Sequence, residues 1–291
     1  MRIGILQYSN RPNLSVNPEP LISDINAAID KGAQVICLQE LAFTSYFCQT
    51  EDETAFADAV PVNGAWKDPY AQIAKDRAVV LVLPFFEKRA PGVFHNSALI
   101  IDADGSTLGV YRKMHIPDDP GFYEKYYFAP GEEFKTWETR YGKIGVCICW
   151  DQWFPEAARL TALSGAQVIF YPTAIGWIPE DRGTEVAQTQ LDAWQTMQRS
   201  HAIANGCYVA AANRIGQETA VDGSGEILFW GNSFIADPGG KIIAQAGADQ
   251  PEILVAELDL ELLETQRIHW PFLRDRRIDA YDALSQRVID K

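Results

Sequence analysis

The feature that most constrains the fold of this chain is an internal repeat. The pentapeptide GAQVI occurs at 32–36 and again at 165–169, and each copy is preceded by an Ile-Gly apolar run and a helical pattern. Both segments therefore read strand, helix, glycine, strand. Such a rhythm is typical of α/β proteins. We predict two similar halves that pack as one four-layer αββα sandwich, with sheets inside and helices outside.

Apolar runs rich in β-branched residues and ended by turn signals predict nine or more strands. They lie at 2–8, 33–40, 78–87, 95–105, 144–150, 166–172, 207–214, 232–240 and 252–259. Helical patterns cover 19–32, 155–165 and 184–206, and 260–285 is predicted to be helical with a break at Pro271. No linker or low-complexity segment divides the chain, so we predict a single domain over 1–291. The segment 260–291 is its C-terminal tail.

Charge and hydropathy exclude several classes of partner. The formal net charge of −14 argues against nucleic acid, which is bound through clusters of basic residues. No run approaches the ~18 apolar residues that cross a bilayer, and the apolar start is too short for a signal peptide. We therefore expect a cytoplasmic protein with no membrane partner. Its five cysteines, an odd number, are expected to be free thiols.

Two cysteines stand two positions apart in the apolar run IGVCICW. Strand alternation puts Ile144, Val146 and Ile148 on one face, and Cys147 and Cys149 on the other. Cys149 comes where the strand gives way to a helix start. There a helix dipole would lower the pKa of a thiol, and free backbone N–H groups would hold an oxyanion. The alternative is that both cysteines only pack in the core.

Two charged residues also occupy positions suited to chemistry. Glu40 ends the run VICLQE, at the carboxyl end of a buried strand, where desolvation would make it a candidate general base. Lys113 follows a hairpin strand and precedes a long segment rich in proline and aromatic residues. The alternatives are a solvated strand end and an exposed basic pair. The four histidines are scattered, so a structural zinc site is not expected.

Together these positions resemble the nitrilase superfamily of carbon–nitrogen hydrolases. The resemblance rests on Glu40 in LQELAFTSYF, Lys113 in YRKMHIPDDPGFYEKYYFAPG, Cys149 in GVCICWDQWFPEAARL and the C-terminal WPFLRDRRIDAY. It implies an αββα fold, no cofactor or metal, and a homodimer or larger homo-oligomer with contacts from the tail. It also implies that Cys149 is the nucleophile, Glu40 its base and Lys113 the oxyanion-stabilising cation. Glu124 matches a second glutamate near this triad.

The residues after the cysteine bear on the substrate. Relatives that act on carbamoyl amino acids carry an arginine there for the substrate carboxylate, whereas this chain has WDQW at 150–153. A small cationic ureido compound, N-carbamoylputrescine, is therefore the expected substrate. The expected substrate-binding residues are Tyr46, Trp150, Asp151, Thr173, Trp177 and Glu180. The acid that pairs with the ammonium is left open. The alternatives are β-ureidopropionate or an aliphatic amide as substrate, or a non-enzymatic thiol or metal-binding protein.

Overall fold

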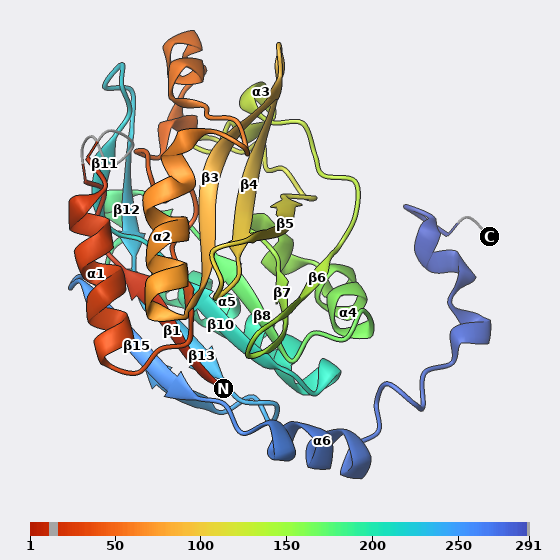
Figure 1. Cartoon of the computed structure of the whole chain (residues 1–291). Coiled ribbons are helices and arrows are strands. Elements are labelled where there is room, and N and C mark those ends of the chain that lie inside the picture. The colour runs from red at the N-terminus through yellow and green to blue at the C-terminus, as the bar shows by residue number, and fades with distance from the viewer. Residues whose placement is uncertain (12–16, 290–291) are drawn as a thin grey trace.

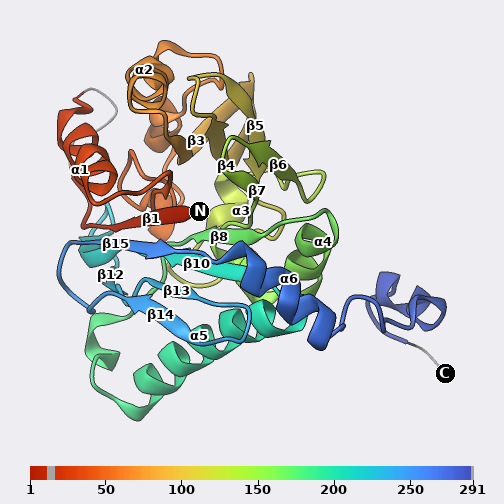
Figure 2. The ribbon, with the colours of Figure 1, turned by 60° about the horizontal axis from the view of Figure 1, so that its bottom comes forward.

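The computed structural model describes residues 1–11 and 17–289. Two six-stranded sheets lie face to face, and helices cover the outer face of each (Figures 1 and 2). The predicted four-layer αββα sandwich is thereby confirmed. No helix of the described residues is both long and apolar enough to cross a membrane.

The first sheet contains most of the N-terminal half and one strand from near the C-terminus. Its order is β15-β1-β2-β3-β4-β5, with β15 Glu252–Glu257, β1 Arg2–Gln7, β2 Val35–Cys37, β3 Val80–Ala90, β4 Val93–Ile101 and β5 Thr107–Arg112. Strands β1, β2 and β3 run parallel, connected by helices α1 (Glu19–Asp30) and α2 (Asp68–Arg77). Strands β3, β4 and β5 are antiparallel.

The second sheet repeats this plan. Its order is β14-β13-β10-β8-β7-β6, with β14 Ile242–Gln245, β13 Phe234–Ala236, β10 Tyr208–Ala212, β8 Val168–Pro172, β7 Gly142–Val146 and β6 Thr136–Thr139. Strands β7, β8 and β10 are parallel, and α4 (Pro155–Leu163) and α5 (Glu185–Asn205) connect them. The two halves thus share the order of their three parallel strands and of the two strands that follow them, and one pattern of crossovers, as the repeated GAQVI predicted.

Three apolar clusters separate the four layers. The central one joins the two sheets and includes Ile3 and Val35 from the first sheet with Val146 and Phe170 from the second. A second cluster packs α1 and α2 against the first sheet, and a third packs α4 and α5 against the second. The central strands of each sheet, such as β2 and β8, are therefore buried on both faces, which explains why the sequence shows continuous apolar runs there rather than clean alternation.

Local sequence sets where the helices begin and end. Thr184 caps α5 by accepting a hydrogen bond from the N–H of Ala187, and Gly206 ends it with a left-handed φ of 52°. Helix α1 buries Leu21, Ile25 and Ala28 on one face. These boundaries agree with the predicted helices to within one or two residues.

Several parts of the fold differ from the prediction. Helix α2 lies in a segment for which no helix was predicted. A small third sheet has the order β11-β12-β9, with β11 Ile215–Thr219, β12 Glu226–Trp230 and β9 Gly176–Trp177, and it was not predicted. The predicted helix over 260–285 is wrong beyond α6 (Leu260–His269), because only short 3-10 turns follow. Pro271 lacks the N–H that a continuing helix needs and disfavours helical backbone at the residue before it. The remaining tail extends away from the body (Figure 2).

Candidate active site

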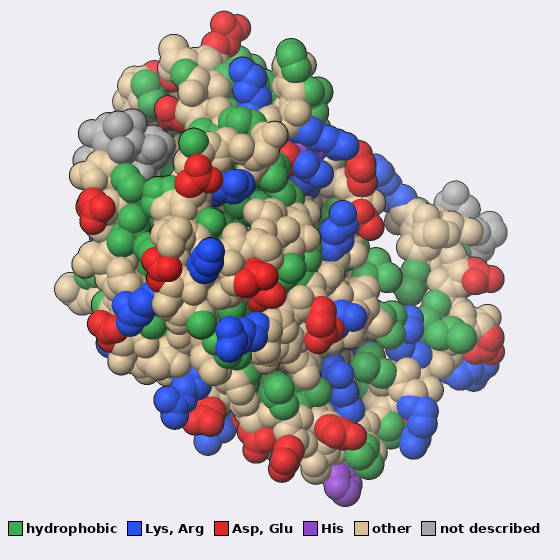
Figure 3. Space-filling model, viewed as in Figure 1, with side chains coloured by type: hydrophobic (Ala, Val, Ile, Leu, Met, Phe, Trp, Pro, Cys, Tyr) green, Lys and Arg blue, Asp and Glu red, His purple; other side chains and the backbone are tan. Residues whose placement is uncertain are grey.

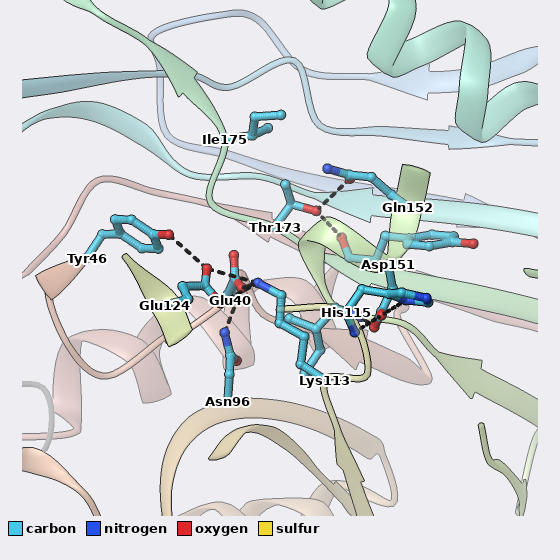
Figure 4. Close-up of polar contacts among 12 residues, drawn as sticks. Glu40, Tyr46, Asn96, Lys113, His115, Glu124, Asp151, Gln152, Thr173 and Ile175 are labelled. Carbon is cyan, nitrogen blue, oxygen red and sulfur yellow. Dashed lines mark hydrogen bonds and ion pairs between the residues drawn. The ribbon is translucent and has the colours of Figure 1, made fainter. Parts of the chain in front are cut away.

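Four residues that are distant in sequence meet at the carboxyl ends of the parallel strands. Glu40 follows β2, Lys113 follows β5, and Cys149 follows β7. Glu124 opens the one-turn helix α3 (Glu124–Tyr127). The side chains of Glu40, Glu124 and Lys113 point toward one another (Figure 4). This edge of a doubly wound sheet is where α/β proteins place their sites.

A buried ion-pair cluster is the centre of the site. Lys113 Nζ donates to Glu40 Oε1 at 2.8 Å and to Glu124 Oε2 at 2.7 Å, and none of these side chains is exposed. Asn96 Nδ2 donates to Glu40 Oε1 at 2.7 Å, and the Tyr46 hydroxyl donates to Glu124 Oε1 at 2.8 Å. Glu40 Oε2 has no hydrogen-bond partner among the described residues. One oxygen of the Glu40 carboxylate is thus left open as an acceptor.

The turn that carries Cys149 differs from the predicted strand end. Strand β7 stops at Val146, and Cys149 opens a 3-10 turn (Cys149–Trp153) with a left-handed φ of 41°. A non-glycine residue rarely adopts this backbone, which is found at strained functional turns. The prediction that Cys147 and Cys149 share a face is therefore wrong. Cys147 packs on the helix side of the sheet, whereas Cys149 lies with the core between the sheets.

The surroundings of Cys149 keep it a thiol at rest. Burial raises the pKa of the thiol well above its ordinary value, and the Glu40 carboxylate adds to this, while the Lys113 ammonium lowers it. The predicted lowering of the pKa by a helix dipole is wrong, because α4 begins only at Pro155 and the thiol is enclosed. The thiol therefore needs a base to become a nucleophile.

Glu124 shares its environment with a second carboxylate. Burial raises the pKa of Glu124 to about 7; the Lys113 ammonium lowers it, and the Glu40 carboxylate raises it. One ammonium faces two carboxylates, so the cluster has a net negative charge when both are ionised. Near neutral pH a proton is therefore held in the cluster in part of the molecules.

Glu124→Gln is expected to change how stability depends on pH. The native state holds the Glu124 proton up to about pH 7, whereas the unfolded chain releases it at its ordinary pKa of 4.5. The wild type therefore loses stability as pH rises between these values, by on the order of 3 kcal/mol, and the variant does not. Denaturant unfolding at pH 4.5 and pH 8 measures this, with exposed Glu180→Gln as control. A stability difference between wild type and variant that is the same at both pH values contradicts the assignment.

A cavity of about 390 Å³ opens onto Cys149 and Glu124. Its walls are largely aromatic, with Phe122, Trp150, Trp153 and Trp230. A second cavity of about 540 Å³ adjoins it and shares four lining residues with it, which are Pro120, Phe122, Gly176 and Gln190. Cys149 thus lies at one end of a pocket large enough for a small molecule.

The structure distributes the expected substrate-binding residues over several places. Trp150 lines the cavity at Cys149, and Trp177 lines the adjoining one. Tyr46 is buried and holds Glu124. Thr173 is fully buried and donates to Tyr171 O, so it does not line either cavity. Glu180 lies exposed on a 3-10 turn and lines neither cavity.

Asp151 does not have the place that was expected for a substrate-binding residue. It is fully buried, and all its acceptor positions are filled by protein donors. Oδ2 accepts from Ile148 N at 2.9 Å and from the Tyr111 hydroxyl at 2.6 Å. Oδ1 lies 2.9 Å from His115 N and 2.7 Å from His115 Nδ1 (Figure 4). Asp151 therefore fastens the Cys149 turn to the segment that follows Lys113.

Sequence reasoning missed several residues of the site. Asn96, which holds Glu40, is a fully buried polar residue within the apolar strand β4, and that contrast was a usable signal. The backbone of Ala174, which lies against the thiol, had no signal of its own. In the part of the chain that the structure describes, no group of three or more His, Cys, Asp or Glu side chains could hold a metal ion.

Comparisons with known proteins agree with this geometry. A family model described as carbon–nitrogen hydrolase matches residues 2–268. An N-carbamoylputrescine amidase from Solanum lycopersicum is 46% identical over 286 residues, which cover 97% of this chain and 94% of the relative. A citrullinase from Francisella tularensis is 41% identical and covers 99% of both chains.

A solved structure agrees over the whole chain. The crystal structure of a carbon–nitrogen hydrolase from Helicobacter pylori G27 matches with a TM-score of 0.92 at 45% identity, covering 99% of this chain and 100% of that one. These matches confirm the resemblance that the sequence suggested. The chain belongs to the carbon–nitrogen hydrolase family of the nitrilase superfamily and is an enzyme that hydrolyses amide-type carbon–nitrogen bonds.

Proposed function

We propose that this enzyme hydrolyses N-carbamoylputrescine to putrescine, carbon dioxide and ammonia, in polyamine synthesis from agmatine. The name of the Solanum relative supports the substrate, and so does the chemistry of the pocket. The observation that carries the proposal is the charge of the walls. Among the described residues that line the two cavities there is no lysine or arginine. Four are acidic, namely Asp119, Glu124, Asp181 and Glu226.

This lining suits a cation and disfavours an anion. Aromatic walls and carboxylates stabilise an alkylammonium chain, whereas a substrate carboxylate would be left unpaired. With the ureido group at Cys149, a four-carbon chain runs along the aromatic wall toward the adjoining cavity. Asp181 and Glu226 line that cavity and are the candidates for the ammonium.

The first chemical step is attack by Cys149 Sγ on the ureido carbon. Glu40 takes the thiol proton as the carbon–sulfur bond forms, and Lys113 stabilises the oxyanion that exists only in the transition state and intermediate. The ureido carbon is a poor electrophile because two nitrogens donate into it. Glu40 then gives its proton to the departing ammonia, and an S-(N-alkylcarbamoyl) enzyme is left.

The second step reuses the same carboxylate. Glu40 accepts a proton from water as the water attacks the carbamoyl carbon, and it returns that proton to the sulfur as the carbon–sulfur bond breaks. The released N-alkylcarbamate loses carbon dioxide and gives the free amine. Glu124 holds Lys113 from the opposite side. Two easier steps thus replace one slow hydrolysis.

Citrulline is the second candidate substrate, because the Francisella relative is named a citrullinase and matches the whole chain. Citrulline has the same ureido group but adds a carboxylate beside its ammonium. Of the residues described around the pocket, no cation of the lining would pair with that carboxylate. We therefore place citrulline second.

Ammonia release tests the substrate directly. The panel is N-carbamoylputrescine, citrulline, β-ureidopropionate and simple linear amides, each at several concentrations. The expected result is a kcat/KM for N-carbamoylputrescine that is at least about tenfold above the others, the size of one unpaired charge in a pocket. A higher value for citrulline or β-ureidopropionate would overturn the proposal in favour of that substrate.

We further propose that the chain is a cytoplasmic homodimer or larger homo-oligomer, with the tail 260–291 in the contact. The support is the exposed apolar surface of this segment, of which residues 270–289 stand away from the body (Figure 3). Its exposed apolar residues include Ile268, Trp270, Phe272, Ile278, Leu284 and Val288. Contiguous exposed apolar side chains of this kind mark protein contacts.

A further inference from the structure

The loop that carries Glu40 has little structure of its own. Between β2 and the 3-10 turn Phe47–Gln49 the chain forms no strand or helix, and Leu41 has a left-handed φ of 47°. The N–H of Ala42 donates to Pro84 O on β3, whereas the carbonyls of Glu40, Leu41 and Thr44 turn toward the second half of the molecule. These carbonyls need hydrogen-bond donors from outside the loop.

That partner is Arg214, at the corner between β10 and β11. Its side chain is completely buried and donates to three carbonyls of the loop. Nη2 donates to Glu40 O at 2.9 Å and to Leu41 O at 3.1 Å, and Nη1 donates to Thr44 O at 3.3 Å. The Phe229 ring lies 5.5 Å from the guanidinium carbon. The guanidinium group thus binds the backbone carbonyl of Glu40 itself.

Glu218 completes the clamp. Its Oε1 accepts from Arg214 Nη1 at 2.6 Å, and its Oε2 accepts from the N–H of Tyr46 at 2.7 Å. Tyr46 in turn donates its hydroxyl to Glu124. The pair therefore holds both ends of the loop, and each end leads to one carboxylate that contacts Lys113.

We propose that the buried pair Arg214–Glu218 is a positioning device for the general base, which fixes Glu40 against the nucleophile without touching substrate. The proposal rests on the proposed role of Glu40. Neither Arg214 nor Glu218 lines the two cavities at Cys149, so the device acts on the proton transfer rather than on binding. A lysine cannot replace this arginine, because one ammonium cannot reproduce the planar fork onto several acceptors.

Asn213, next to Arg214, fixes the backbone of the cavity wall near Cys149. Asn213 accepts from the N–H of Ile175 at 3.0 Å and donates to Ile175 O at 3.1 Å. Ile175 follows Ala174, whose backbone lies against Cys149, and both line the cavity. Two consecutive side chains thus fix the base loop and the cavity wall. Loss of Asn213 is expected to raise KM, in contrast to loss of Arg214.

Alkylation of Cys149 by iodoacetamide tests the proposal without reference to any substrate. The rate is followed by mass spectrometry of the Cys149 peptide between pH 6 and pH 9. We expect Arg214→Lys and Glu218→Gln to react at least tenfold more slowly than wild type at pH 7. Their rates should rise steeply with pH, since solvent hydroxide must replace the base. In turnover, kcat should fall in proportion while KM stays within twofold.

Arg267→Lys is the matched control. Arg267 also donates to two backbone carbonyls, Gly206 O at 2.8 Å and Ala166 O at 3.0 Å, but it lies outside the site. The Arg267→Lys substitution should lower the thermal midpoint and leave the rate of Cys149 alkylation within twofold of wild type. If Arg214→Lys does not fold, the alkylation rate of Glu218→Gln tests the proposal instead, because that substitution replaces only one oxygen by a nitrogen.

The outcomes separate this inference from the proposed function. Slow alkylation of Glu40→Gln together with wild-type alkylation of Arg214→Lys and Glu218→Gln overturns the positioning role alone. Wild-type alkylation of Glu40→Gln overturns the role of Glu40, on which both proposals depend. Slow alkylation of all three variants supports the positioning role even if N-carbamoylputrescine is not turned over.

Discussion

Cys149→Ala is expected to reduce kcat for N-carbamoylputrescine by roughly 10⁴-fold or more and to leave the fold intact. The substitution deletes the proposed nucleophile, so water must attack the ureido carbon in one step. The fold should tolerate it because alanine keeps the Cβ and removes one sulfur from a site that already holds a cavity. Ammonia release measures the rate. A substrate-dependent rise of the thermal midpoint shows that the variant still binds.

Cys147→Ala is the control for that prediction, because Cys147 is the same residue type two positions away. Its sulfur lies 3.5 Å from Thr161 Oγ1, and it packs with Ala157 and Ala158 on the helix side of the sheet. We expect a loss of about 1 kcal/mol in stability, as for an average core substitution, and kcat within threefold of wild type. If turnover survives in Cys149→Ala and is lost in Cys147→Ala, the nucleophile is misassigned.

The architecture was predictable where buried strands and capped helices repeat. The GAQVI copies mark equivalent β2 and β8 strands, and glycine after α1 and α5 marks helix ends. The third sheet was not predictable, because β9 has only two residues and pairs with β12, about fifty positions away. Pairing over that distance leaves no periodic signal in a short segment.

The site was predictable to the level of its charged residues but not of their environment. Glu40 and Lys113 follow strands whose ends meet, so position made them candidates, and the family resemblance implied their roles. The direction of the Cys149 pKa shift was misjudged, because it depends on burial and on two carboxylates brought from other segments. Asp151 was misassigned for a similar reason. Its partner His115 lies 36 positions away and is unreadable from the motif.

The supporting residues were the least predictable. Arg214 contacts Glu40 across 174 positions and lies in none of the motifs that carry the family resemblance. The sequence does not distinguish a buried arginine from the exposed ones that are the rule, and only the fold shows which carbonyls this one binds.

Lys113→Met is expected to cost both activity and stability. The variant leaves Glu40 and Glu124 buried without their cation, and breaking a buried pair in this way costs about 3–5 kcal/mol. It also removes the group proposed to stabilise the oxyanion, which should lower kcat by roughly 10²–10³-fold. Denaturant unfolding and steady-state ammonia release measure the two effects. The matched control is Lys125→Met, on the exposed face of α3 and 3.9 Å from Asp118, which should cost at most about 1 kcal/mol.

The pH dependence of the Lys113→Met defect distinguishes lost charge from lost packing. Without the ammonium, the pKa of Glu124 rises further above its value of about 7, because burial is no longer opposed by a cation. The wild type stops losing stability once pH passes the Glu124 pKa of about 7, whereas the variant, with its higher pKa, continues to lose stability above pH 7. The loss of stability caused by Lys113→Met should therefore be larger at pH 8 than at pH 5. Methionine fills nearly the same volume, and a packing defect would not change with pH. Equal losses at both pH values would therefore contradict the view that Lys113 neutralises two carboxylates.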